Sequence, residues 1–126
     1  MIPILALALA LGAARPDAGF AARVTRAKLA EAAPEGGAYQ KALWRKIGDP
    51  TTDAYRGCLA SNAPADKRPF TLVADVGRDG HPARIAVMPA TPVAACMAGQ
   101  FARWTLPPPP TQPAPYPVEI DFSVTP

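Results

Sequence analysis

Residues 70–88 read FTLVADVGRDGHPARIAVM, and this stretch predicts a β-hairpin. Its first seven residues follow the period of two that marks a strand, with apolar side chains at Phe70, Leu72, Ala74 and Val76. Gly77-Arg78-Asp79-Gly80 predicts a turn, because its two glycines can take a positive φ, and Ala83–Met88 returns as the second strand.

A helix and a third strand are predicted after the hairpin. Thr91 offers a capping hydroxyl and Pro92 a preset φ, so a helix is expected to begin there. It must end before Pro107–Pro110, because none of these four prolines has a backbone N–H to donate. Val118–Val124 then alternates as a strand with one apolar and one polar face. The apolar stripe expected along the helix consists of Val93, Cys96, Met97, Phe101 and Trp104.

Helical patterns precede the hairpin. We expect one helix over residues 20–33 and another over 38–47, which Gly48-Asp49-Pro50 ends. Thr51 or Thr52 then caps a further helix whose inward face carries Cys58. Together these elements predict an α+β fold, a two-layer sandwich in which helices cover a three-stranded antiparallel sheet.

The chain of 126 residues is expected to hold one main core. Residues 1–14 predict a signal peptide, because an apolar run ends in the small residues Gly12, Ala13 and Ala14. The alternative is a buried N-terminal helix of a cytosolic protein. The run is too short for a membrane anchor, which needs about 20 apolar residues. Residues 15–50 then form an N-terminal helical segment and residues 51–126 the α+β domain, and the expected location is periplasmic or secreted.

Two cysteines, Cys58 and Cys96, are the only ones in the chain. In an oxidising compartment an isolated pair of this kind is expected to form a disulfide. The alternatives are a reactive thiol or a metal site. A metal site would need further ligands, and the chain has a single histidine, His81.

Charge and motifs weigh against several classes of protein. The net charge is +3 and the basic residues are scattered, so nucleic acid is not an expected partner. No glycine-rich phosphate loop links a strand to a helix, and we expect no cofactor. His81 is interpreted as an exposed turn residue, Asp79 as part of the turn, and Asp75 as solvated or paired with an arginine. We therefore expect no catalytic residues.

The edge of a small sheet is the most promising candidate site, because its unpaired backbone groups can receive an added strand. The proline run or an N-terminal helix could instead cover that edge. A second candidate is a loop, either the hairpin tip at Arg78-Asp79 or Pro107–Pro110, as in a secreted inhibitor or an envelope stress protein. Open sheet edges also pair with themselves, so a homodimer is compatible with the sequence.

An ordered set of features then suggests a family. It comprises Cys58 before the hairpin, the strand Phe70–Val76, Asp79-Gly80, the return strand, Cys96, Trp104-Thr105-Leu106-Pro107 and the strand Val118–Val124. In this order the chain, from about residue 51 to 124, resembles the TonB C-terminal domain family, and within it the cysteine-containing AgmX/PglI-type domains. It departs from that family in lacking a Ser-Ser-Gly segment after the hairpin, a long membrane anchor and an extended periplasmic spacer.

This resemblance implies a periplasmic adaptor of the cell envelope that pairs its last strand with a short peptide from an outer-membrane partner. The residues carried over to that role are Val118, Glu119, Ile120, Asp121 and Phe122. The expected function is therefore protein binding by strand addition, and coupling to an inner-membrane motor is not carried over.

Overall fold

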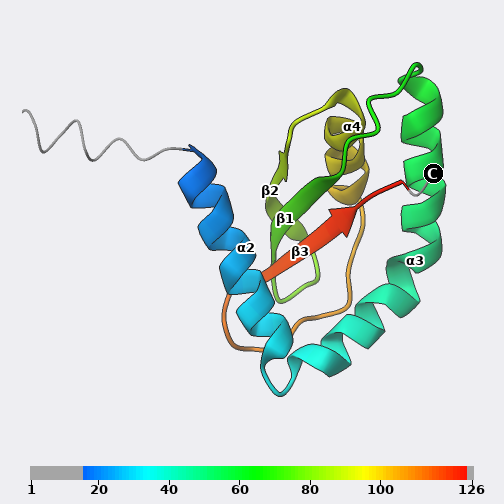
Figure 1. Ribbon diagram of the computed structural model, residues 1–126. Coiled ribbons are helices and arrows are strands. Elements are labelled where there is room, and N and C mark those ends of the chain that lie inside the picture. Colours follow the sequence, from blue (N-terminus) through cyan, green and yellow to red (C-terminus); the bar gives the residue numbers. More distant parts are fainter. Residues whose placement is uncertain (1–15, 125–126) are drawn as a thin grey trace, which may run out of the picture.

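The computed structural model describes residues 16–124 of the chain, so the predicted signal peptide at residues 1–14 lies outside the described part. The described chain folds as helices and strands in the order helix, helix, hairpin, helix, strand (Figure 1). Their bounds are α2 Pro16–Ala32, α3 Gly36–Ser61, β1 Phe70–Val76, β2 Pro82–Met88, α4 Pro92–Phe101 and β3 Tyr116–Phe122. The predicted α+β class is confirmed.

The three strands form one antiparallel sheet in the order β2-β1-β3. The predicted hairpin is confirmed as the pair β1 and β2, and β3 pairs with the other side of β1. The last strand begins and ends two residues before the predicted Val118–Val124, because Tyr116 and Pro117 pair with Val76 and Asp75. Val124 lies beyond the strand and is exposed.

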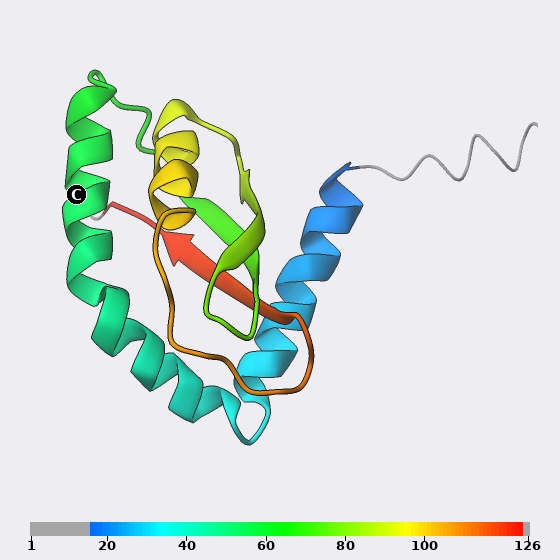
Figure 2. The same cartoon turned by 180° about the vertical axis from the view of Figure 1, so that it is seen from behind.

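Helices α3 and α4 pack on one face of the sheet and enclose the core. Figures 1 and 2 show α4 and α2 on opposite faces of the sheet, with α3 along one side. The core joins the inward residues of all three strands to α3 and α4, and its largest fully buried side chains are Tyr116, Phe101, Leu43, Leu72, Met97 and Leu106. The second face is covered by α2, which contacts β3 and β1.

The predicted end of a helix at Gly48-Asp49-Pro50 is wrong. Helix α3 continues from Gly36 to Ser61 with Pro50 inside it, and Figure 1 shows it bending midway. Pro50 has no N–H to donate to the Lys46 carbonyl oxygen, and in the next turn the Oγ1 of Thr52 donates to the Gly48 carbonyl oxygen at 3.2 Å. Ile47 and Thr51 are buried on either side of Pro50, so packing holds both halves as one helix. The boundary predicted at residue 50 therefore falls inside α3.

Helix α4 begins where the sequence predicts. The backbone N–H of Ala94 donates to the Oγ1 of Thr91 at 3.1 Å, and Pro92 occupies the first turn. The helix ends at Phe101, before Trp104, whose ring still packs on Phe101 with a centroid distance of 5.8 Å. The chain then crosses the hairpin tip, where the Leu106 N–H donates to the Gly80 carbonyl oxygen at 2.8 Å. Gly80 has a φ of 86°, and a Cβ there would collide with the Leu106 carbonyl, so this position requires glycine.

Candidate functional site

The sheet has two outer strands, β2 and β3, on either side of β1. An outer strand exposes the backbone N–H and C=O groups that point away from its neighbour, and another chain can pair with them. The two edges are therefore the first places to look for strand addition, and their construction differs.

The β2 edge is irregular. The register between β1 and β2 shifts between Val73 and Asp75, where β2 carries one extra residue. Arg84 lies in this bulge with a φ of 51°, a conformation that favours glycine. Pro82 begins the strand and Pro89 follows it, and neither has an N–H to offer. Bulges and prolines of this kind hinder the addition of a further strand.

The bulge directs the Arg84 side chain onto Asp75. Arg84 Nη1 donates to Asp75 Oδ2 at 2.8 Å, and Arg23 Nη2 of α2 lies 3.7 Å from Asp75 Oδ1. Arg23 Nη2 also donates to the Arg84 carbonyl oxygen at 2.6 Å. Asp75 is buried, so these contacts neutralise a carboxylate that would otherwise be costly to bury. The predicted pairing of Asp75 with an arginine is confirmed.

The β3 edge is regular. Each residue from Tyr116 to Phe122 pairs with one residue of β1, without a bulge. Pro117 is its one proline, and a proline in a strand is accommodated where its nitrogen faces away from the neighbouring strand. We infer from the alternation of an antiparallel ladder that the backbone groups of Glu119 and Asp121 also point outward. The strand from Val118 to Phe122 therefore has the backbone of an open edge.

The side chains of this strand divide between the two faces. Val118, Ile120 and Phe122 are buried in the core, and the Phe122 ring stacks on Phe70 with a centroid distance of 4.7 Å. Asp121 is exposed on the second face, where the Oγ1 of Thr71 donates to its Oδ1 at 2.6 Å. Of the five residues predicted to bind a partner, three therefore offer only their backbone.

Glu119 lies beneath α2, which the alternating pattern of the strand did not predict. Its side chain is 7% exposed, and its Oε1 lies 3.6 Å from the Nζ of Lys28. Nearby, the Tyr116 hydroxyl donates to the carbonyl oxygen of Ala30 at 3.4 Å. Helix α2 thus covers the beginning of β3, and the segment from Ile120 to Phe122 lies beyond these contacts. The predicted alternative of an N-terminal helix over the edge applies to the first half of the strand.

The electrostatics around Glu119 are unusual for a glutamate. Burial, a hydrogen bond with the Glu31 side chain, and the negative charges of Asp121 and Glu31 raise the pKa of Glu119 to about 7. Lys28 acts in the opposite direction. The Oε1 atom has no hydrogen-bond partner among the described residues. Glu119, at the junction of α2 and β3, therefore changes its protonation state near neutral pH.

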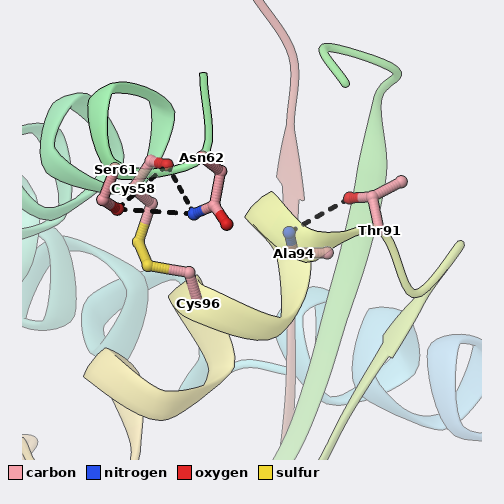
Figure 3. The surroundings of a disulfide bond; sticks show 6 residues. All are labelled: Cys58, Ser61, Asn62, Thr91, Ala94 and Cys96. Carbon is pink, nitrogen blue, oxygen red and sulfur yellow. Dashed lines mark hydrogen bonds between the residues drawn. A yellow bond between two sulfur atoms is a disulfide. The ribbon is translucent and has the colours of Figure 1, made fainter. Parts of the chain in front are cut away.

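The predicted disulfide is present between α3 and α4. The Sγ atoms of Cys58 and Cys96 are bonded at 2.06 Å, with the two Cα atoms 5.8 Å apart (Figure 3). Asn62 at the end of α3 donates from Nδ2 to the Cys58 carbonyl oxygen at 2.8 Å, which satisfies a terminal acceptor of the helix. The disulfide fastens the two core-side helices to each other.

The remaining residues that the sequence singled out lie apart from one another. His81 and Asp79 form an exposed contact at the hairpin tip, with 2.8 Å between Nδ1 and Oδ2, and hydrogen bonds from His81 lower the pKa of Asp79. The Tyr39 hydroxyl donates to the Pro107 carbonyl oxygen at 2.9 Å and so fixes the beginning of the proline run. Over residues 16–124, no three His, Cys, Asp or Glu side chains gather as metal ligands would.

Within the described part of the chain, none of the helices has both the length and the apolar character needed to cross a membrane. Comparison of the chain with protein-family models, curated proteins and solved structures finds no match. The functional argument therefore depends on the geometry of the sheet edge and on the chemistry of its residues.

Proposed function

We propose that this protein is an exported protein-binding module of the cell envelope, similar to a TonB C-terminal domain, that binds an extended peptide by strand addition at β3. One observation carries the proposal: β3 is a regular outer strand that pairs with β1 without a bulge, while the other outer strand is interrupted. The agreement in element order with the resembled family is a second support.

The binding segment would run from Ile120 toward Val124, because α2 covers the beginning of β3. The N–H and C=O of Asp121 would form the central pair of hydrogen bonds with the added strand. Each backbone hydrogen bond contributes about 0.5–1.5 kcal/mol net, so several are needed for useful affinity. Specificity would come from side chains on the second face of the sheet. There Thr71 is the cross-strand neighbour of both Met88 and Asp121.

The disulfide supports placing this function outside the cytoplasm, in the periplasm or beyond the cell. Disulfides persist in oxidising compartments and are rare where thioredoxin and glutathione keep thiols reduced. We propose binding rather than catalysis, without a cofactor.

Two variants at one position test the proposal. Asp121→Pro removes the outward N–H and leaves the ladder to β1, whereas Asp121→Ala keeps that N–H and loses the same side-chain contact with Thr71. The oxidised protein and both variants would be used to select peptides from a random extended library, with affinities measured by calorimetry. We expect Asp121→Pro to weaken binding about tenfold or more relative to Asp121→Ala.

Equal affinities in the two variants would refute strand addition at β3. If binding were instead lost on Arg78→Ala, at the exposed hairpin tip, the loop-based alternative of a secreted inhibitor would be favoured. Circular dichroism of each variant would verify that the fold is kept.

A further inference from the structure

A groove opens on the second face of the sheet, away from the binding segment proposed above. It lies between the C-terminal half of α2 and the proline-rich segment that leads into β3, and its volume is about 470 Å³. This is within the size range of sites for small organic ligands, roughly 300–1,000 Å³. Its lining comes from α2, from both strands of the hairpin and from residues 113–117.

The walls of the groove are mostly apolar. Ala30 lines it from α2 and Ala33 from the residue after that helix, and Pro113, Pro115 and Pro117 line the opposite side. Leu29 also lines it, and its side chain is 66% exposed, which is unusual for a leucine packed beside a well-formed core. Prolines have little conformational freedom to lose, so a ligand would order few wall residues on binding.

The polar groups of the groove are mainly cationic. Arg26 and Arg84 line it, and within the described residues Arg26 has no carboxylate at ion-pair distance. Arg84 uses one nitrogen on Asp75, but its side chain is 65% exposed and other N–H groups of the guanidinium are free to reach a ligand. Asp75, the one acidic lining residue, is already engaged by Arg84 and Arg23.

We propose that this groove binds a medium-chain fatty acid. The hydrocarbon chain would lie between Leu29 and the prolines, and the carboxylate would accept hydrogen bonds from Arg26 and Arg84. A guanidinium can present two parallel N–H groups to a carboxylate, which suits a groove whose lining is apolar except for Arg26, Arg84 and the already paired Asp75. Three guanidinium groups against one carboxylate leave a positive field that attracts a single anionic head.

The first experiment compares decanoate, below its micelle concentration, with decan-1-ol, below its solubility limit in water. The two probes share their hydrocarbon chain and differ in the charged head. Binding to the oxidised protein would be followed by calorimetry and by amide chemical shifts in ¹⁵N-labelled protein. We expect decanoate to bind about tenfold more tightly than decan-1-ol or better, with shifts concentrated in residues 26–33 and in the two amides of the opposite wall, Ala114 and Tyr116.

Variants then locate the site. Arg26→Gln should reduce decanoate affinity about fivefold or more and leave decan-1-ol affinity unchanged, because it removes the charge without removing an apolar wall. Leu29→Gln should weaken both probes. Arg45→Gln, an exposed arginine on α3, serves as the matched control and should change neither affinity.

Three results would overturn the proposal: equal affinity for decanoate and decan-1-ol, an unchanged decanoate affinity in Arg26→Gln, or shifts outside the groove. Tight binding of N-acetyl-leucine without binding of decanoate would also overturn it, and would assign the groove to the C-terminal residue of a peptide. The readouts are independent of strand addition at β3, so either proposal can fail alone.

Discussion

The two edges of this small sheet share β1 as their neighbour and are built in opposite ways. On β2, a bulge at Arg84 and two flanking prolines interrupt the row of backbone donors and acceptors. On β3, an uninterrupted register runs from Tyr116 to Phe122, and its one proline stands near the beginning. Outer strands in soluble proteins are commonly protected against unwanted pairing. On β3 that protection is limited to the first half, which α2 covers, and the second half is the segment for which we propose strand addition.

The helices differ between the two sides as well. Helix α4 contacts β2 and is fixed to α3 by the disulfide. Helix α2 lies on β3 through small side chains, one ion pair and one hydrogen bond of a tyrosine. The β2 side is therefore covalently secured, whereas the cover of β3 is held by non-covalent contacts alone.

The largest effect is expected from Ile120→Pro, which tests the alternation inferred for β3. Ile120 is buried, and its N–H is inferred to bond to β1, so proline removes both a ladder bond and core packing. We expect the free energy of unfolding to fall by about 5 kcal/mol, measured by urea denaturation. Asp121→Pro should cost about 1 kcal/mol in the same assay. Equal losses would mean that the outward positions on β3 are assigned incorrectly.

Removing the disulfide should have the next largest effect. It tests how much the covalent link between α3 and α4 contributes to stability. The bond closes a separation of 38 residues, so the double variant Cys58→Ser, Cys96→Ser should lose about 4 kcal/mol of unfolding free energy through the entropy of the unfolded chain. Urea denaturation of the wild-type protein with and without reductant should give the same difference. A loss below about 1 kcal/mol would show that non-covalent packing already fixes α4 to α3.

The carboxyl group between α2 and β3 predicts a pH dependence. In the folded protein the pKa of Glu119 is about 7, raised from an unfolded value of 4.5, so the folded state holds the proton more tightly. Stability should therefore fall as the pH rises from 4.5 to 7, and level off above that. We expect a decrease of at least about 1 kcal/mol, because each unit of pKa shift between the folded and unfolded states corresponds to about 1.4 kcal/mol.

The control for this dependence is Glu119→Gln, which cannot ionise. Its unfolding free energy, measured at a series of pH values, should lack the decrease between pH 4.5 and 7 that the wild-type protein shows. If the two profiles ran parallel, the decrease would arise from another group, and Glu119 would not hold a proton beneath α2.

Local sequence signals were sufficient for the parts of the fold whose interactions are local. The strand Phe70–Val76 has its predicted bounds because alternation and a glycine turn are both encoded within a few residues. The start of α4 follows from Thr91 and Pro92 for the same reason. The continuation of α3 through Pro50 was not predictable, because packing of Ile47 and Thr51 against the rest of the protein outweighs the local signal.

The sequence was sufficient to predict that the candidate site is a strand. It was not sufficient to predict which parts of that strand other elements cover. Alternation placed Val118, Ile120 and Phe122 on the apolar face correctly, since it requires only the period of a strand, whereas Val124 lies beyond the strand and is exposed. The beginning of β3 is covered through Lys28 beside Glu119 and Ala30 beside Tyr116, which lie about 90 positions earlier in the chain, and no local sequence pattern predicts such contacts. The groove beside Leu29 likewise joins three segments that only the folded chain brings together.

The smallest effect concerns the bulge that protects β2. Arg84 has a φ of 51°, which costs a non-glycine residue about 1 kcal/mol, and its side chain neutralises the buried Asp75. Both Arg84→Ala and Arg84→Gly remove the ion pair, but only glycine relieves the backbone. We therefore expect Arg84→Gly to be about 1 kcal/mol more stable than Arg84→Ala in urea denaturation. If the two variants were equally stable, the positive φ would not be retained without arginine, and the bulge would depend on the contact with Asp75. In that case the Arg84 side chain, and not the backbone, would produce the bulge that interrupts the β2 edge. The structural difference between β2 and β3 would then depend on this one side chain.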